Sequence, residues 1–172
     1  DFVIRGLPRK KLEKWFSSLG TIDFVGRTFG VYKFLPQNLD PQKHSFVDIA
    51  LPRTEQAHPQ SQGGYKEFHV QSDETLPIQE DLSRRDFTMN AMAIRVQSGE
   101  LLDPFHGTAD IEAKMIRAVG DPHARFDEDL SRMLRAIRFA AELSFNIEEE
   151  TLHAFSSRKE RLVSTVIPRE TV

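Results

Sequence analysis

The sequence of 172 residues contains no cysteine, which excludes disulfide bonds and zinc sites built on thiolates. No run of apolar residues approaches the ~18 that a membrane-spanning helix needs, and no signal-peptide pattern is present. The chain also lacks a global excess of Lys and Arg, since its formal net charge at pH 7 is −3. This balance argues against nucleic-acid binding through overall charge and leaves only local basic clusters for that role.

The composition is that of a folded globular chain, because 39% of the residues are hydrophobic and 28% are charged. The length fits one domain, or one domain followed by a short second segment. The sequence begins inside a strand-like pattern and ends without a stop signal. We therefore expect it to be a segment of a longer protein.

Apolar periodicity divides the first part of the chain into strands and helices. Leu12, Trp15 and Phe16 have helical spacing within residues 9–19, and Gly20 is expected to cap this helix. Strands are predicted at 1–5, 21–25, 29–34, 45–51 and 68–70, with a hairpin turn at 26–27. In 45–51, Val47 and Ile49 alternate with Asp48, as in a half-buried strand.

Further along, polar residues 52–65 are expected to form a loop. A helical stretch lies within 77–90, and an extended segment at 91–96 turns at Gly99 to pair with Leu101 and Leu102. These hairpins, grouped around one sheet, favour an α+β fold over a doubly wound parallel one. The expected architecture is a mixed sheet with flanking helices.

The character of the chain changes after Gly120, where helical patterns replace strands. Helices are predicted at 127–143, 148–155 and 160–163. We therefore divide the chain into an α/β head domain at 1–118 and an all-helical continuation at 119–172.

The segment 127–143 has the pattern of one long amphipathic helix. Its apolar residues fall on one side of the helix: Leu130, Met133, Leu134, Ile137, Ala140 and Ala141. Arg132, Arg135 and Arg138 fall on the other side, and no acidic residue interrupts them between Leu130 and Ala141. A solvated charged face is the ordinary explanation, but guanidinium groups also suit phosphate and planar hydrogen-bond recognition.

Asp129 and Arg132 are three residues apart, so one continuous helix would make them neighbours on its surface. An acceptor beside a donor matches the pairing edges of cytosine and adenine, which offer an amino group beside a ring nitrogen. The alternative is a surface ion pair that contributes less than ~1 kcal/mol to stability.

Three blocks of sequence carry a resemblance to a known family: RRDFTMNAMA at 84–93, LLDPFHGTADI at 101–111 and RFDEDLSRMLRAIRFAAEL at 125–143. Together with DFVIRGLP, GRTFGVYKF, VDIALPRTE and IPRETV, they resemble the class II tRNA nucleotidyltransferase and bacterial poly(A) polymerase family. The resemblance covers essentially the whole chain. It implies a nucleotidyltransferase-type head followed by a helical neck, with body and tail domains beyond the sequence given.

The resemblance also implies roles for individual residues. Asp1 matches the second member of the family's metal-binding Asp-x-Asp pair, whose first member and Gly-Gly loop would precede residue 1. The sugar- and phosphate-binding pair maps to Arg85 and Asp86, with Asn90 as support. The base-reading pair maps to Asp129 and Arg132, and the positions that contact the bound nucleotide map to Arg135 and Arg138.

The activity implied by the resemblance is attack of an RNA 3′-hydroxyl on the α-phosphate of CTP or ATP, with release of pyrophosphate. The implied partners are the tRNA 3′ end, CTP and ATP, in a cytoplasmic enzyme. Closely spaced carboxylates would hold Mg²⁺, which prefers oxygen ligands. Asp1 is the first candidate ligand and Asp48 a second, the alternative for Asp48 being an outward-facing strand acid.

Other interpretations stay open at this stage. CCA-, CC- and A-adding enzymes and poly(A) polymerases share these motifs, and a non-catalytic RNA- or nucleotide-binding module is a rival of another class. Asn90 could equally be a polar residue satisfied within the packing. The histidines show no metal-ligand spacing, so none is assigned a role.

Overall fold

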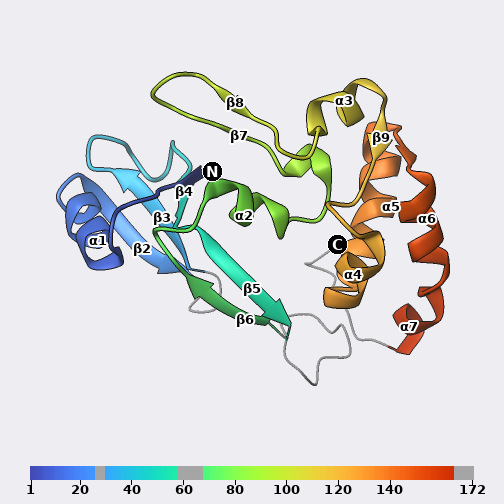
Figure 1. The fold of residues 1–172 in the computed structure, drawn as a ribbon. Helices are drawn as coiled ribbons and strands as arrows, with labels where there is room; N and C mark the ends of the chain where they lie inside the picture. Colours follow the sequence, from blue (N-terminus) through green and yellow to red (C-terminus); the bar gives the residue numbers. More distant parts are fainter. Residues whose placement is uncertain (26–29, 58–67, 165–172) are drawn as a thin grey trace. The chain divides into compact units, whose positions relative to one another are not determined.

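A computed structural model describes residues 1–25, 30–57 and 68–164 (Figure 1). The chain divides into two compact units. The first contains the described residues of 1–56 and of 69–81, and the second contains Ala57, Phe68 and the described residues from Leu82 onward. None of the described helices has the length and apolar character that crossing a membrane requires.

The first unit is built on a four-stranded mixed sheet with the strand order β1-β4-β3-β2. β1 and β4 are parallel, whereas β3 is antiparallel to both β2 and β4. β5 and β6 form a separate two-stranded sheet. The elements, in chain order, are β1 (Phe2–Val3), α1 (Arg9–Ser17), β2 (Gly20–Val25), β3 (Val31–Pro36), β4 (Val47–Ala50), β5 (Arg53–Ala57), β6 (Phe68–Ser72) and α2 (Ile78–Ser83), whose last turn enters the second unit.

The core of the first unit lies between α1 and one face of this sheet. Leu12 and Phe16 of α1 pack with Tyr32 and Phe34 of β3, and the Phe16 and Phe34 rings meet edge to face with their centroids 4.7 Å apart. Ile49 of β4 completes this cluster and Val47 packs against it. The alternation predicted for residues 45–51 is confirmed, because Asp48 lies on the opposite face of the sheet.

Gly20 has a different role from the helix cap that the sequence suggested. α1 ends at Ser17 with Ser18 as its C-cap, and Gly20 is the first residue of β2. A Cβ atom at Gly20 would lie 2.1 Å from the carbonyl oxygen of Leu35. Glycine is required there because the paired strand approaches too closely for a side chain.

Two further predictions for this region are corrected and one is confirmed. Residues 52–65 do not form a loop throughout, since 53–57 make up β5, and the strands form more than one sheet. The remaining part of that loop and the turn at 26–27 lie outside the described residues. The antiparallel pairing of the strands on either side of that turn is confirmed.

The second unit combines a small hairpin with a group of helices. β7 and β8 pair antiparallel, with Gly99 in the left-handed conformation in the turn between them, as predicted. β9 and β10 pair in parallel. The elements are η1 (Thr88–Asn90), β7 (Ala93–Ile94), β8 (Leu101–Leu102), α3 (Gly107–Glu112), β9 (Met115–Ile116), α4 (Pro122–Glu128), α5 (Ser131–Leu143), β10 (Asn146–Ile147), α6 (Glu149–Ser156) and α7 (Lys159–Ser164).

The described residues after Gly120 are mostly helical but include strand β10, so this part is not entirely helical. Phe126, Leu130 and Met133 pack with Ala154 of α6, and Figure 1 shows α5 and α6 side by side. The predicted boundary between 118 and 119 lies within the second compact unit. It stays a prediction.

The prediction of one helix over 127–143 is wrong. α4 ends at Glu128, Asp129 is extended with φ −148° and ψ 105°, and α5 begins at Ser131. The Asp129 Oδ1 atom accepts a hydrogen bond from the Ser131 backbone N–H at 2.8 Å. This bond satisfies an amide in the first turn of α5, the position at which Asp typically starts a helix.

The buried face of α5 is also rotated from the predicted one. Arg132 is 7% exposed, whereas Ile137 and Leu143 are 46% and 45% exposed. Ala136 is buried with Phe87 and Ile116, while Ala141 is exposed. Periodicity placed the arginine outside because it weighs hydrophobicity only and does not register the hydrogen bonds that allow a guanidinium to be buried.

We predict an alkaline loss of stability that depends on Tyr32. Burial first, and then the 2.7 Å hydrogen bond to Glu13, raise the pKa of the Tyr32 phenol from 10.0 to about 12. The folded state therefore holds the phenolic proton more tightly than the unfolded state. The stabilisation is complete below pH 10 and is lost as the pH rises towards about 12.

Urea unfolding at a series of pH values checks this prediction. The free energy of unfolding should fall more steeply between pH 10 and about 12 in the wild-type chain than in Tyr32→Phe. Tyr32→Phe keeps the ring and removes only the ionising group, so other alkaline titrations cancel in the comparison. Parallel curves for the two proteins would show that Tyr32 ionises normally.

Candidate nucleotide-binding site

The segment around Arg85 and Asp86 is held by backbone pairing with residues 117–119. The Thr88 N–H donates to the Arg117 carbonyl at 2.9 Å, and the Val119 N–H donates to the Asp86 carbonyl at 3.0 Å. Phe87 lies between these bonds and is fully buried. Its burial fixes the two preceding residues at the edge of the core.

The Asp86 carboxylate is the centre of the candidate site. Its Oδ2 atom accepts hydrogen bonds from Arg135 Nε at 2.8 Å and is 2.7 Å from Arg135 Nη2. Its Oδ1 atom accepts from the Phe87 N–H at 2.9 Å and from Asn90 Nδ2 at 3.1 Å. The Asp86 side chain is 10% exposed. Three residues predicted separately, Asp86, Asn90 and Arg135, are thus brought together.

Arg85 joins the same cluster through the backbone of η1. Its Nη1 atom donates to the Asn90 carbonyl at 3.1 Å. Arg85 and Asn90 are therefore linked to each other as well as to the Asp86 region. The Asn90 side chain has a hydrogen-bond partner, Asp86. This contact is also what we expect of a residue that supports Asp86 in the site.

Arg132 lies in a second cluster, at the junction of α4 and α5. Its Nη1 atom donates to Glu128 Oε2 at 2.8 Å and to the Arg125 carbonyl at 3.2 Å, and its Nη2 atom donates to the Arg84 carbonyl at 3.0 Å. The guanidinium is therefore buried but satisfied. Arg84 is the residue before Arg85, so the hydrogen bond from Arg132 to the Arg84 carbonyl also links the second cluster to the first.

Asp129 does not pair with Arg132 as a neighbour on a helix surface, which corrects the sequence prediction. The helix breaks between them, and Asp129 caps the Ser131 amide instead. Glu128 takes the place beside Arg132, and Arg125 also binds Glu128. The i,i+4 spacing of Glu128 and Arg132 was a signal in the sequence that could have identified this pair.

Arg138 lies on α5 one turn after Arg135 and is more loosely held. Its guanidinium carbon lies 4.6 Å from the centroid of the Phe139 ring, and its Nε atom is 3.7 Å from Glu142 Oε2. The Arg135 guanidinium contacts the same ring at 5.1 Å, and the Phe139 ring meets Phe87 edge to face. Phe139, which the sequence reading missed, thus positions both arginines.

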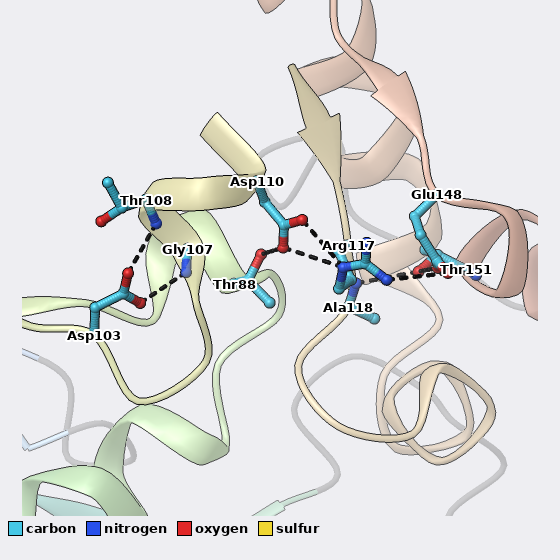
Figure 2. A network of polar contacts seen from close by, with 9 residues as sticks. All are labelled: Thr88, Asp103, Gly107, Thr108, Asp110, Arg117, Ala118, Glu148 and Thr151. Carbon is cyan, nitrogen blue, oxygen red and sulfur yellow. Dashed lines mark hydrogen bonds and ion pairs between the residues drawn. The ribbon is translucent and has the colours of Figure 1, made fainter. Parts of the chain in front are cut away.

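A polar network holds Thr88, at the start of η1, to the rest of the unit (Figure 2). The Thr88 hydroxyl donates to Asp110 Oδ2 at 2.7 Å, and Arg117 Nε donates to both Asp110 oxygens at 3.1 and 3.2 Å. Gly107 lies against the Thr88 carbonyl, where a Cβ atom would be only 2.3 Å away. Glycine at position 107 therefore allows the start of α3 to lie directly against η1.

The network continues to the first turn of α6. Arg117 Nη1 is 3.2 Å from Glu148 Oε1, and the Thr151 N–H and hydroxyl both donate to Glu148 Oε2 at 2.8 Å. Against the opposing effect of burial, the bonds from Thr151 lower the pKa of Glu148. The Ala118 N–H donates to the Thr151 hydroxyl at 3.2 Å (Figure 2). The segment carrying Arg85 and Asp86 is therefore fixed to both α3 and α6.

The metal candidates Asp1 and Asp48 belong to the first unit. Phe2 of β1 pairs in parallel with Ile49 of β4, so the same register places Asp1 beside Asp48 on one face of the sheet. Lys33 of β3 lies opposite Asp48, and its Nζ atom is 2.5 Å from Asp48 Oδ1. Asp23 of β2 lies opposite Lys33.

These residues form a row across the sheet, away from α1. Two adjacent carboxylates suit a hard cation such as Mg²⁺, which binds through one or two carboxylates and substrate phosphates. Among the described residues there is no group of three or more side chains that could hold a metal alone. The pair fits the family's metal in donor chemistry, with Lys33 as the competing cation for Asp48.

The fold, a mixed sheet with flanking helices, is that of a nucleotidyltransferase head domain. The chain belongs to the family described as the Poly A polymerase head domain, whose family model matches residues 1–117. The resemblance stated from the sequence motifs is thereby confirmed.

The similar proteins include CCA-adding enzymes. The CCA-adding enzyme of Pediococcus pentosaceus is 49% identical over 96 residues, which are 55% of this chain and 24% of that protein. The chain spans between 24% and 32% of the length of such curated relatives.

Solved structures show the same similarity. The Bacillus stearothermophilus CCA-adding enzyme in complex with CTP matches with a TM-score of 0.65 and 32% identity, covering 83% of this chain and 31% of that one. A CCA-adding enzyme in complex with ATP matches with a TM-score of 0.71 and 29% identity, covering 97% of this chain and 35% of that one.

The Asp86 cluster predicts a contrast between two acidic residues that face α5 arginines. Asp86→Ala leaves Arg135 without its carboxylate partner at a mostly buried position and should lower the free energy of unfolding by about 2 kcal/mol. Glu142→Ala removes the partner of Arg138, but Glu142 is 60% exposed, so the loss should stay below about 1 kcal/mol.

Chemical unfolding followed by circular dichroism measures both variants under the same conditions. Equal losses for the two variants would contradict the structural role given to Asp86. Asp86→Asn, which keeps the shape of the side chain, should lie between Asp86→Ala and the wild type.

Proposed function

We propose that this chain is the nucleotide-binding and part of the metal-binding portion of an enzyme that adds CMP, AMP or both to the 3′ end of tRNA. CTP and ATP are the nucleotide substrates, pyrophosphate is the second product, and Mg²⁺ is the metal. The enzyme works in the cytoplasm. The proposal concerns the whole protein, of which the chain is a part relative to its matched relatives.

The cluster around Asp86 is the observation that carries the proposal. Asp86 and Arg135 are 49 residues apart in the chain, yet the Asp86 carboxylate connects Asn90 and Arg135. Arg85 joins them through its hydrogen bond to the Asn90 carbonyl. Asp86 pairs with Arg135, and Arg85 and Arg138 add two further guanidinium groups, the side chain that suits a triphosphate. The CTP and ATP complexes of similar enzymes agree with this chemistry.

Base selection is assigned to Asp129 and Arg132, which are held at fixed places before any nucleotide binds. Arg132 is oriented by Glu128 and two backbone carbonyls, and Asp129 by the Ser131 amide. Groups whose orientation is fixed discriminate between hydrogen-bonding edges better than mobile ones. An acidic acceptor and a guanidinium donor match the amino group and ring nitrogen of cytosine and adenine, and mismatch guanine and uracil.

In the reaction, the terminal 3′-hydroxyl oxygen of the RNA forms a bond to the α-phosphorus of the nucleotide. The bond from that phosphorus to the bridging oxygen breaks, the hydroxyl proton leaves to solvent, and pyrophosphate departs. When bound, Mg²⁺ supplies charge stabilisation at the attacking and leaving oxygens. Asp1 and Asp48 would hold it, while Arg85, Arg135 and Arg138 bind and orient the phosphates and sugar.

A poly(A) polymerase is the second candidate within the same family. The family model carries that name, and the Asp86 cluster serves either activity. The similar proteins named here are CCA-adding enzymes, which favours tRNA as the acceptor. A non-catalytic nucleotide-binding module would keep the Asp86 cluster and lack transfer.

Incorporation assays with the full-length protein test the proposal. We expect labelled CTP to extend tRNA that ends before CCA or at C, and labelled ATP to extend tRNA that ends at CC. Repeated AMP addition to any RNA would indicate a poly(A) polymerase, and nucleotide binding without transfer would indicate the non-catalytic module.

Asp129→Ala with Arg132→Ala should abolish the preference for CTP and ATP over UTP and GTP. Because Arg132 is buried, this double variant also needs a control for folding. Asp129→Asn provides it, since the amide can still cap Ser131 while presenting a donor to the base. Unchanged selectivity in both variants would remove Asp129 and Arg132 from base reading.

Asp48→Asn should reduce metal-dependent transfer by two orders of magnitude or more (~10²-fold) while nucleotide binding persists, because only the carboxylate charge is lost. Asp23→Asn is the matched control, since Asp23 lies on the same face two strands away. Titration of transfer with Mg²⁺ and Mn²⁺ measures the change. Full activity of Asp48→Asn would assign Asp48 to a structural pair with Lys33.

A further inference from the structure

α1 and its flanking residues carry a local charge opposite to that of the chain as a whole. The segment from Phe2 to Ile22 contains Arg5, Arg9, Lys10, Lys11 and Lys14, with Glu13 as its only acidic residue. Its formal charge is therefore +4 in a chain whose net charge is −3. A local basic cluster of this kind can bind a polyanion even though the chain as a whole is acidic.

The cations of α1 are divided between two sides of the helix. Arg9 faces the protein, where its Nε atom is 2.9 Å from Glu13 Oε1 and its guanidinium lies 4.3 Å from the centroid of the Phe24 ring. Glu13 is also bound by the Tyr32 hydroxyl. The acid of this segment is thus held on the side that faces β2 and β3, away from the lysines.

Lys10, Lys11 and Lys14 occupy the opposite, exposed side. Residues 11, 14, 15 and 18 follow the i, i+3, i+4 and i+7 spacing that places them on one helix face. Around the helix, Trp15 and Lys14 lie at the two edges of this face, and Lys11 lies between them, one turn before Trp15. Lys10 lies one turn before Lys14, so the exposed side of α1 carries three ammonium groups and one aromatic ring.

Trp15 is 53% exposed, which is unusual for the largest apolar side chain. It meets the buried Phe16 ring edge to face, with centroids 4.9 Å apart. This contact anchors one side of the indole and leaves more than half of the side chain open to a ligand. An aromatic ring held in this way is suited to stacking on a planar group.

We propose that this face of α1, defined by Lys10, Lys11, Lys14 and Trp15, binds a single-stranded segment of the RNA substrate. The lysines neutralise backbone phosphates and the indole stacks on an unpaired base, a combination that binds single strands with little sequence preference. The proposal rests on the proposed function, because it takes RNA as the ligand. It adds a contact outside the nucleotide site.

The apolar side of α1 distinguishes RNA from a lipid surface as the ligand. A helix that lies on a membrane inserts its apolar face into the lipid. The apolar face of α1 is already used, because Leu12 and Phe16 are buried against Tyr32 and Phe34 of the sheet. Within α1, Trp15 is the single large apolar residue that is exposed, and it lies among lysines, a combination that suits single-strand binding.

Trp15 is the only tryptophan of the chain, so its fluorescence reports directly on this face. We expect a tRNA transcript lacking the terminal CCA, and a short single-stranded RNA oligomer, to quench the emission in a saturable way. Vesicles of phosphatidylserine and phosphatidylcholine should leave the emission unchanged. A blue shift with vesicles and no response to RNA would overturn the proposal in favour of a membrane surface.

Charge reversal tests the lysines. The triple variant K10E/K11E/K14E should bind the same RNA at least about tenfold more weakly, and its plot of log affinity against log salt should be shallower by about 2. The matched control is K43E/K114E/K159E, which changes the net charge equally at exposed lysines elsewhere. An equal loss of RNA affinity in the two triple variants would show that only the net charge of the chain matters, and it would overturn the proposal.

Substitution of the aromatic residue tests stacking, with labelled RNA as the probe. Trp15→Ala should weaken binding by about tenfold, and Trp15→Phe should restore most of it, because base stacking needs only an aromatic face. Thermal unfolding shows whether each variant is folded. Wild-type affinity in folded Trp15→Ala would contradict the stacking contact.

CTP binding, measured on the same samples, separates this proposal from the proposed function. RNA binding that is lost in K10E/K11E/K14E while CTP binding is kept supports the α1 face. Wild-type protein that binds CTP but not RNA overturns this inference alone. Wild-type protein that binds RNA at α1 but not CTP contradicts the nucleotide site and leaves the α1 contact standing.

Discussion

The contact between Asp86 and Arg135 is the constraint on which the candidate nucleotide site depends. It joins a short segment that precedes η1 to the middle of α5, and the same carboxylate holds Asn90. A mostly buried carboxylate needs charge compensation and several hydrogen bonds, and Asp86 receives both. Arg135 is therefore directed towards Asp86, the neighbour of Arg85 in the chain, by electrostatics as well as by helix geometry.

The second constraint is the break between α4 and α5. It turns Asp129 into a helix cap and buries Arg132 against Glu128, so that both residues are fixed by neighbours. The polar network from Thr88 through Asp110 and Arg117 to Glu148 then restrains the other side of the Asp86 segment (Figure 2). Such a rigid arrangement is what discrimination between similar nucleotides demands.

Much of the fold was accessible from the sequence where one strong pattern governed a segment. Leu12 and Phe16 predicted α1, and the alternation around Asp48 predicted the two faces of β4, because apolar burial alone decides such elements. β5 was missed because its polar sequence gives no alternating apolar signal. The continuous helix at 127–143 was wrong because periodicity does not detect a local cap such as that of Asp129.

The candidate site was predictable as a set of residues but not as a set of contacts. The motifs identified Asp86, Asn90 and Arg135, yet their meeting depends on tertiary packing of segments far apart in sequence. Glu128 and Phe139 were given no role in the site because an acid in the first turn of a helix and a core aromatic residue are ordinary features. Their importance lies in what they position, namely Arg132 in one case and Arg135 with Arg138 in the other.

The crystal structure of the protein with CTP bound tests the central claim most directly. We predict that the sugar and phosphates contact Arg85 and the Asp86 region, and that the cytosine edge faces Asp129 and Arg132. CTP bound without contact to these residues would contradict the assignment of the second unit as the nucleotide-reading part of the enzyme.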